Sequence, residues 1–382
     1  MAHDTHDNRR DEGQRPVALY VMEQTLGHVT HTKNLQALVP RDGALDPEFV
    51  LVPYELGRWA FPGWSNWTVR AGIRAGRQLI GRRRRHRRPA AMFVHTQVPA
   101  VLLAPWIRST PTVVSIDATP QQYDELGEFY AHGRSHPRIE GLKYRANRAC
   151  FRRARHIVSW SHWGKQGLVD GYGIDPDRVT VIPPGVDIDR WHRPAPRSQE
   201  EGAAVRILFV GGDLRRKGGD LLIEAVRRVR RDPQGPPIEL HLVTGAEVDE
   251  EPGVVVHRGL TSNSPELIAQ YHAADIFCLP TLGDCLPMVL AEAAASGLPL
   301  ISTDVGAIGE LVRTGETGEL VRPGDLDALT AAVRSLVADP MLRVQYGTAA
   351  RRLAEAEHDA RTNAGRIAAI LDCVADGREV PA

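Results

Sequence analysis

The chain has 382 residues, 42% of them hydrophobic, and its 47 Lys and Arg residues balance its 47 Asp and Glu residues. This length predicts two domains with packed cores, and the zero net charge offers no bulk electrostatic attraction for nucleic acid. Its four cysteines form no CxxC pair and no metal-ligand spacing. This excludes a disulfide framework, and we expect a cytoplasmic protein without a metal site.

The chain begins with a polar, charged segment that lacks the apolar stretch of a signal peptide, so we expect a disordered tail over residues 1–15. Residues 16–184 then alternate short β-rich segments with helical ones. The predicted strands are VALYVM, FVLV, AMFVHT, TVVSI, HIVSW and VTVI, with helices near 64–85 and 137–153. Such alternation predicts an α/β domain whose parallel sheet is covered on both faces.

A stretch rich in Pro, Gly and charge predicts an interdomain linker at 185–204. Alternation resumes over 205–358, and residues 359–382 are expected to form a C-terminal helix that packs back on the first domain. The second set of predicted strands is RILFV, IELHLV, VVVHRG, DIFCLP and LPLIST, with helices near 218–231, 264–274, 287–296 and 325–338. Two doubly wound domains would face each other across a cleft, where the C-terminal strand edges favour ligand binding.

A glycine-rich loop follows the first strand of the second domain, in the segment ILFVGGDLRRKGG. Gly211 and Gly212 allow backbone N–H groups to approach an anion before a helix, and Arg216 and Lys217 add positive charge. The spacing matches neither GxGxxG nor GxxxxGK[ST]. The alternative is a solvated turn with two surface cations.

The segment CLPTLGDCLPMVLAEAAASG places Asp284 and Glu292 on either side of a predicted helix N-terminus. Pro287 suits the first helical position, and the neighbouring N–H groups are free to point at a phosphate or a sugar oxygen. A carboxylate accepts two hydrogen bonds side by side, so Glu292 could hold a ribose diol. The alternative is an acidic residue that stabilises the helix dipole beside an unrelated surface charge.

In the first domain, polar residues follow predicted strands. Gly27 lies in the loop after the first strand with His28 beside it, while His95 and Asp117 end later strands. Strand-end polar groups that face a cleft are catalytic candidates, although a single strand-end histidine is more often structural. In the second domain, Glu310 is most simply a helix residue, and Gly315 and Gly318 are turn residues.

A basic run, RRRRHRR, follows a predicted helix near several aromatic residues. Its arginines are Arg82, Arg83, Arg84, Arg85, Arg87 and Arg88. Such a run is typical either of peripheral contact with an anionic membrane, here at its inner face, or of a solvated helix end.

Taken together and in this order, the motifs make the chain similar to the retaining glycosyltransferases of family 4, which have the GT-B fold. The matching pieces run from the loop at Gly27 through VTVIPPGVDIDRW, FVGGDLRRKGG, YHAADIFCLPT, EAAASGLPLISTDVGAIGELV and GETGELVRPGD. The resemblance covers nearly the whole chain from about residue 16. It implies two Rossmann-like domains and a sugar transferred from a nucleotide-diphosphate-sugar co-substrate, with no cofactor.

By this resemblance, Arg216 and Lys217 neutralise the diphosphate and Glu292 holds the ribose. Gly259 and Leu260 face the base, and Gly27 lies near the diphosphate. The transferred sugar and phosphate contact Asp284 and the backbone of Cys285, Leu286, Pro287 and Met288. His28 belongs to the acceptor side, and Asp284, His95 and Asp117 are the catalytic candidates. The acceptor is a small molecule, a lipid-linked sugar or a polysaccharide.

The resemblance also implies that the anomeric configuration is retained by front-face attack, with the leaving phosphate assisting deprotonation of the acceptor. No metal is expected, because fixed cations and helix amides stabilise the departing diphosphate. The chain departs from the family pattern at three points. Asp284 replaces the usual Glu, the phosphate loop reads GGD where an Arg usually follows the glycine, and Asp117 stands where many relatives have a His. The alternatives are a nucleotide-sugar epimerase, a non-catalytic binding protein on this fold, and a nucleic-acid or membrane-surface module.

Overall fold

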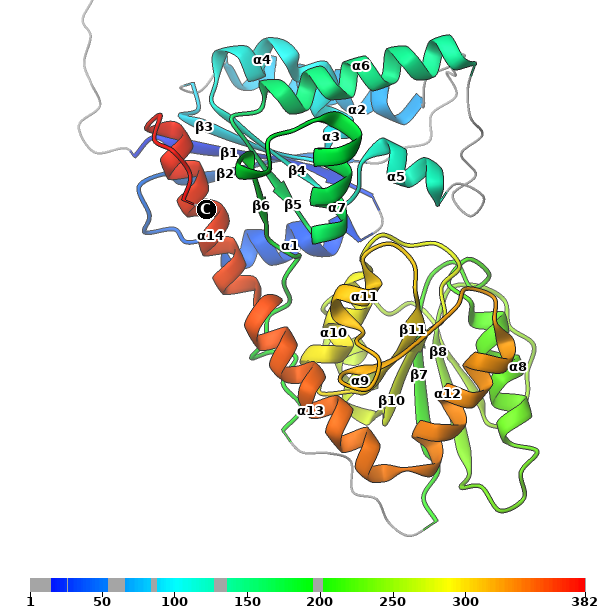
Figure 1. The fold of residues 1–382 in the computed structure, drawn as a ribbon. Helices are drawn as coiled ribbons and strands as arrows, with labels where there is room; N and C mark the ends of the chain where they lie inside the picture. The colour runs from blue at the N-terminus through cyan, green and yellow to red at the C-terminus, as the bar shows by residue number, and fades with distance from the viewer. Residues whose placement is uncertain are drawn as a thin grey trace, which may run out of the picture.

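The computed structural model describes residues 15–25, 27–53, 66–83, 88–126, 136–194 and 202–381. It contains two six-stranded parallel sheets, each in its own domain (Figure 1). The predicted N-terminal tail, apart from residue 15, lies outside the described residues, as do Arg84, Arg85 and Arg87 of the basic run.

The first sheet has the order β2-β1-β3-β4-β5-β6. Its strands are β2 (Asp46–Pro53), β1 (Val17–Gln24), β3 (Ala91–His95), β4 (Thr112–Ile116), β5 (His156–Ser159) and β6 (Val179–Val181). Every residue of β3, β4 and β5 is buried, as expected for strands that are covered by helices on both faces. The helices of this domain are α1 (His28–Leu38), α2 (Asn66–Arg83), α3 (Gln97–Ala100), α4 (Ala104–Ser109), α5 (Pro120–Glu125), α6 (Pro137–Arg153) and α7 (His162–Gln166).

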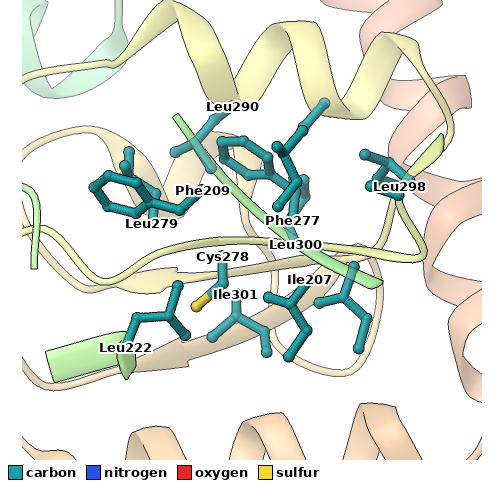
Figure 2. Packing of buried hydrophobic residues seen from close by; sticks show 14 of the residues in the cluster. Ile207, Phe209, Leu222, Phe277, Cys278, Leu279, Leu290, Leu298, Leu300 and Ile301 are labelled. Atoms are coloured by element: carbon teal, nitrogen blue, oxygen red, sulfur yellow. The ribbon is translucent and has the colours of Figure 1, made fainter. Parts of the chain in front are cut away.

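The second sheet has the order β12-β11-β10-β7-β8-β9. Its strands are β12 (Gly318–Val321), β11 (Leu300–Thr303), β10 (Ile276–Leu279), β7 (Val205–Val210), β8 (Ile238–Val243) and β9 (Val254–His257). Its helices are α8 (Gly219–Val229), α9 (Pro265–Ala273), α10 (Met288–Ala295), α11 (Ile308–Leu311), α12 (Leu326–Ala338) and α13 (Pro340–Glu357). Figure 2 shows the core, where Phe209 and Phe277 of the sheet pack near Leu290 of α10.

One strand contradicts the sequence-based prediction. Gly318 was expected in a turn, yet it begins β12 and pairs with Leu300 of β11. A Cβ added at Gly318 would lie 1.8 Å from the Leu300 carbonyl oxygen, so only glycine allows this close approach. The prediction was wrong because a four-residue strand that starts with glycine carries little β propensity.

The end of the chain returns to the first domain. Helix α13 lies along the second domain, and α14 (Ala360–Ala375) lies along the first, as Figure 1 shows in orange and red. Ile367 and Leu371 of α14 are buried in the same cluster as Tyr20 and Phe93 of the first sheet. Two segments therefore cross between the domains, and they meet at a parallel bridge between Val186 and Asp359.

The segment predicted as a linker is not wholly a spacer. The side chain of Trp191 is fully buried in the core of the second domain. Its ring meets Tyr271 edge to face, with centroids 5.0 Å apart. Residues 195–201 lie outside the described part of the chain.

Candidate active site between the domains

A cleft of about 2040 Å³ lies between the two domains and is lined by both. The C-terminal ends of the parallel strands face it, which is the favoured ligand position for this class of sheet. The two domains approach each other closely at this cleft. A Cβ at Gly27 of the first domain would lie 3.6 Å from Met288 Cγ, and Thr30 donates a hydrogen bond to Ser262 at 2.9 Å.

The glycine-rich loop after β7 is held against the loop after β10. Gly218 has a φ of 77°, and a Cβ there would lie 1.9 Å from the Pro280 carbonyl oxygen, so glycine is required twice over. Arg216 Nη1 donates to the Gly283 carbonyl at 2.8 Å. Lys217 Nζ forms an ion pair with the Asp284 carboxylate. The loop therefore presents two cations beside Asp284, and all three side chains line the cleft.

Helix α10 points its N-terminus at the same place. Pro287 is its N-cap and makes no side-chain capping hydrogen bond. The first N–H groups of the helix are therefore available to a ligand, and the helix dipole favours an anion there. Met288 and Val289 both line the cleft.

Glu292, one turn further along α10, is 3% exposed and lines the cleft. Its Oε2 accepts a hydrogen bond of 2.8 Å from the Tyr271 hydroxyl, which leaves Oε1 for a ligand. Burial raises the pKa of Glu292 to about 7, although the hydrogen bond from Tyr271 lowers it. A bound ligand that donates hydrogen bonds to this carboxylate would favour its ionised form.

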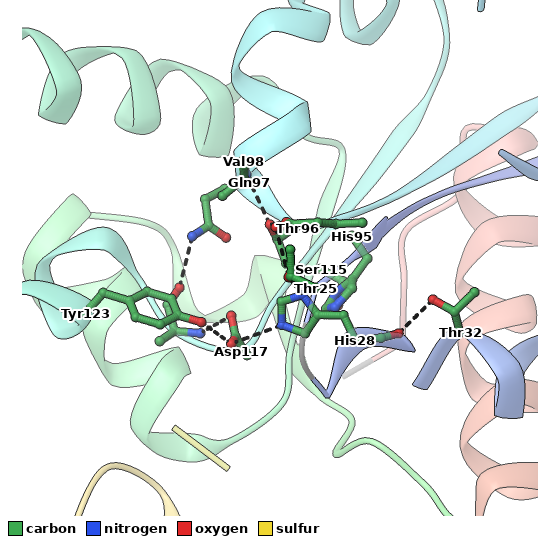
Figure 3. Close-up of polar contacts among 12 residues, drawn as sticks. Thr25, His28, Thr32, His95, Thr96, Gln97, Val98, Ser115, Asp117 and Tyr123 are labelled. Carbon is green, nitrogen blue, oxygen red and sulfur yellow. Dashed lines mark hydrogen bonds and ion pairs between the residues drawn. The ribbon is translucent and has the colours of Figure 1, made fainter. Parts of the chain in front are cut away.

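On the first domain, Asp117 follows β4 and lines the cleft. Figure 3 shows it between His28 and Tyr123. His28 Nε2 lies 3.3 Å from Asp117 Oδ2, and the Tyr123 hydroxyl donates to the same carboxylate. Burial alone would raise the pKa of Asp117, but its hydrogen bonds with His28 and Tyr123 lower it. Burial would also lower the pKa of His28, yet the Asp117 carboxylate raises it. The pair therefore favours an ionised Asp117 carboxylate on the side of the cleft formed by the first domain.

Among the described residues, no group of three or more His, Cys, Asp or Glu side chains is placed to hold a metal ion. In the same part of the chain, no helix is both long and apolar enough to cross a bilayer.

Two family models match the chain in succession and cover most of it. The model for glycosyltransferase family 4 matches residues 35–190, and the model for glycosyl transferases group 1 matches residues 204–339. The chain belongs to glycosyltransferase family 4. It is therefore a glycosyltransferase, and the epimerase alternative is not favoured.

Curated relatives agree with this family. A glycogen synthase of Mycobacterium tuberculosis is 29% identical over 338 residues, which are 82% of this chain and 77% of that protein. A D-inositol 3-phosphate glycosyltransferase of Pseudarthrobacter chlorophenolicus is 32% identical over 216 residues. That match covers 52% of this chain and about half, 51%, of the relative.

Solved structures show that this chain has the GT-B fold. Sucrose-phosphate synthase of Thermosynechococcus elongatus superposes with a TM-score of 0.70 and 16% identity, over 92% of this chain and 96% of that one. HepE of Anabaena, solved with UDP and glucose, superposes with a TM-score of 0.66 and 16% identity. This match covers 94% of this chain and 100% of HepE. At these identities the likeness shows the fold alone.

The structure gathers nearly all the predicted site residues of this glycosyltransferase around one cleft. The predicted residues that line it are Gly27, His28, Asp117, Gly211, Gly212, Arg216, Lys217, Gly259, Leu260, Asp284, Cys285, Leu286, Pro287, Met288 and Glu292. Their roles in binding and catalysis stay predictions.

His95 needs correction. It is not among the residues that line the cleft, and its side chain is fully buried. Its ring stacks on Trp160 with centroids 5.0 Å apart, and Nδ1 lies 3.2 Å from the Ser115 hydroxyl. Burial and the neighbouring His28 and His31 lower its pKa well below the ordinary value. At the last position of β3, the His95 side chain points into the core and not into the cleft. It is therefore a neutral, buried histidine.

Sequence reasoning missed Glu23, the last residue but one of β1, which lines the cleft and is 3% exposed. It accepts hydrogen bonds from Trp67 Nε1 and Thr96 Oγ1, both at 2.5 Å, and from Thr25 Oγ1 at 3.1 Å. A Glu near the end of a strand carries no recognisable signal by itself. Glu23 stands out only in the structure, where hydrogen-bond donors from distant parts of the chain converge on its carboxylate.

Proposed function

We propose that the protein transfers a sugar from a nucleotide-diphosphate-sugar donor to an acceptor hydroxyl, with retention of the anomeric configuration and without a metal ion. The observation that carries this proposal is the meeting of Lys217, Arg216 and the uncapped N-terminus of α10 at one point of the cleft. This arrangement suits the two phosphates of the donor and of the departing nucleoside diphosphate.

The donor would lie along the second domain. Glu292 Oε1 would accept hydrogen bonds from the ribose. Gly259 and Leu260, which line the cleft, would contact the base. Asp284 and the backbone of the loop that ends at Met288 would contact the transferred sugar. A family relative is named as GDP-mannose-dependent, and HepE was solved with UDP, so the donor base is left open.

Bond cleavage separates charge, because the anomeric carbon becomes positive while the diphosphate becomes more negative. Fixed cations and helix amides at the diphosphate stabilise that separation and cost no reorganisation during the reaction. Asp117 would stabilise the positive sugar from the acceptor side. The acceptor hydroxyl would attack the same face that the diphosphate leaves, and a departing phosphate oxygen would take its proton.

The first test is the thermal stability of the purified protein with a panel of nucleoside diphosphates and nucleotide sugars, run beside Lys217→Ala and Glu292→Ala. A matching donor should raise the melting temperature of the wild type, and each variant should lose most of the rise. Product made with that donor should keep the anomeric configuration in the proton NMR spectrum, and chelation of divalent metal should not slow its formation. An inverted product, or equal donor shifts in wild type and both variants, would contradict the proposal.

Peripheral membrane contact through the basic run stays a separate prediction. Arg82, at the end of α2, already pairs with Glu48 at 2.7 Å. Arg84, Arg85 and Arg87 lie outside the described residues. Sedimentation with anionic vesicles, compared between wild type and a variant with these three arginines changed to serine, would decide between membrane contact and a solvated helix end.

A further inference from the structure

The two ring nitrogens of His28 have different partners in the cleft (Figure 3). Nε2 lies 3.3 Å from Asp117 Oδ2, and Nδ1 lies 3.0 Å from the Thr25 hydroxyl. The Thr25 hydroxyl in turn donates to Glu23 Oε1 at 3.1 Å. All four residues line the cleft. A continuous chain of hydrogen bonds therefore links two carboxylates, Glu23 and Asp117, through the His28 ring.

The directions of these hydrogen bonds decide how many protons the ring carries. An ionised carboxylate accepts hydrogen bonds and donates none, so His28 Nε2 must donate to Asp117. Thr25 has a single hydroxyl proton, which it donates to Glu23. Toward His28 the Thr25 oxygen can therefore only accept, and Nδ1 must carry a proton as well. A ring that donates from both nitrogens is an imidazolium.

The alternative is a neutral ring with the proton on Glu23, and the contacts of Glu23 oppose it. Trp67 Nε1 donates to Glu23 Oε1 and Thr96 Oγ1 donates to Glu23 Oε2, both at 2.5 Å. Together with Thr25, three donors meet this one carboxylate. Its oxygens thus act as acceptors, and the proton belongs to the ring.

The neighbouring histidines fix the orientation of the His28 ring and do not compete for its charge. The His95 ring stands at 73° to it, with centroids 4.6 Å apart. Burial, followed by the nearby His28, lowers the pKa of His31 to about 3 and that of His95 well below its ordinary value, so both are neutral at pH 7. Burial alone would lower the pKa of His28 too, but the carboxylates of Asp117 and Glu23 raise it.

We infer that His28 is a positioning residue that works as an imidazolium: it holds the Asp117 carboxylate in place for sugar transfer and balances the charge of Glu23. The inference rests on the proposed function, in which Asp117 stabilises the positive charge of the sugar. Two buried carboxylates without a counter-charge repel each other, and one of them takes up a proton. A neutral Asp117 would lose its role. The proton of His28 stays on the ring throughout the reaction.

The first test reads the protons of the ring and needs no substrate. Long-range proton–nitrogen NMR spectra of protein labelled in its histidines distinguish an imidazolium from either neutral tautomer. At pH 7.5, His28 should be an imidazolium, whereas His31 and His95 should be neutral. The His28 signal is the one that is lost in His28→Gln and moved in Thr25→Val.

Thr25→Val removes the hydroxyl that requires the second ring N–H. The pH at which His28 loses its proton should fall by about one pH unit in this variant. Thr32→Val is the matched control, because the Thr32 hydroxyl donates to the His28 backbone carbonyl at 2.8 Å and not to the ring. It should leave that pH unchanged. A neutral His28 ring in wild type at pH 7.5, or equal midpoints in wild type and Thr25→Val, overturns the inference.

The second test links this proton to the reaction. With a donor selected by the stability panel, release of nucleoside diphosphate to water or to an acceptor is followed from pH 6 to 9.5. As His28 loses its proton, kcat should fall by about tenfold, with the midpoint that NMR gives. KM for the donor should change little, because the second domain holds the donor. Asp117→Asn should be slow at every pH, and adding His28→Gln to it should slow it no further.

Two kinetic outcomes would show that His28 does not act through Asp117 and would overturn the inference. One is a kcat that stays constant through the NMR midpoint, and the other is a further loss of kcat when His28→Gln is added to Asp117→Asn. Failure of the proposed function has a different signature, since no donor would then yield nucleoside diphosphate with wild type. The role of His28 in transfer would fall with it, whatever the ring spectra show.

Discussion

Lys217 and Asp284 form an ion pair that joins the glycine-rich loop of the second domain to the loop before α10. Their side chains are 14% and 12% exposed. Arg216 Nη1 lies 3.8 Å from the same Asp284 oxygen. Both cations proposed to hold the diphosphate are thus already close to one internal anion.

This contact predicts opposite effects of one substitution on binding and on transfer. Asp284→Asn should tighten nucleoside diphosphate binding by about three- to tenfold, because the phosphates no longer compete with a carboxylate for Lys217. The same change should lower kcat, because Asp284 is expected to contact the transferred sugar. Calorimetry and initial-rate assays measure the two quantities. Lys217→Ala is the matched control and should weaken diphosphate binding, and a weaker diphosphate affinity in Asp284→Asn would contradict the competition.

Glu292 makes a defined contribution to the pH dependence of stability. Its pKa is raised to about 7, so between about pH 4.5 and 7 the folded state binds more protons than the unfolded state. The free energy of unfolding contributed by this group therefore falls as pH rises, by about 1.4 kcal/mol per pH unit in that window. Glu292→Gln keeps the shape and the Tyr271 contact but removes this dependence.

Urea unfolding at pH 5, 6, 7 and 8 measures the effect. The stability of Glu292→Gln relative to wild type should rise across this series and level off above about pH 7. A Glu355→Gln variant changes an exposed carboxylate of α13 and controls for the lost charge. A constant difference between Glu292→Gln and wild type would contradict the prediction.

Two buried histidines predict sensitivity to acid. Burial, followed by the nearby His28, lowers the pKa of His31 to about 3. The pKa of His95 is also lowered well below its ordinary value, first by burial. Below about pH 6.5 the unfolded state therefore binds protons that the folded state does not, so stability falls as pH falls, by about 1.4 kcal/mol per pH unit for each histidine.

The Nε2 atoms of both rings are buried without a hydrogen-bond partner. Replacing each histidine by leucine should therefore cost little at pH 8 and should flatten the loss of stability between pH 6.5 and 4. Exposed His162 changed to leucine is the control. Denaturant unfolding measures the slopes, and a slope equal to that of wild type in His31→Leu and His95→Leu would show that neither ring resists protonation in the fold.

Glu310 fastens one domain to the other. The residue was predicted to be a plain helix residue, but its carboxylate accepts the backbone N–H groups of His162 and Trp163 at 2.9 and 2.8 Å. These groups begin α7 in the opposite domain, so the carboxylate serves as a helix cap across the cleft. Glu310→Ala should open the domains and raise the radius of gyration measured by small-angle X-ray scattering. Glu316→Ala, a nearby exposed change, should leave the scattering curve as in wild type, and an identical curve for both variants would contradict this role.

Local pattern predicted the fold well where segments are regular. The helix expected at 137–153 and the strand TVVSI have the predicted bounds. Both are indicated by the periodicity of hydrophobic residues, which is a local property of the sequence. The short strand β12 was missed, since its pairing depends on the absence of a Cβ at Gly318 and not on its own propensity.

Some residues of the site were predictable from the sequence and others were not. The place of Lys217, Asp284 and Glu292 beside one cleft was predictable, because each lies in a loop or helix that follows a predicted strand. Glu23 was not, because Trp67 and Thr96, which bind it, are 44 and 73 residues away in the chain. A strand-end residue such as His95 can face either the cleft or the core. A single sequence does not show which of the two it faces.

The return of α14 to the first domain has a consequence for the order of synthesis. Ala364, Ile367 and Leu371 complete an apolar cluster that begins with Ala18 and Tyr20 of β1. Before α14 is made, this face of the first sheet is covered only in part, by Leu35 of α1 and by Val39. The first domain is synthesised first, but its packing is complete only after α14 has been made. Until then, part of the apolar surface of β1 and β3 is exposed and open to aggregation.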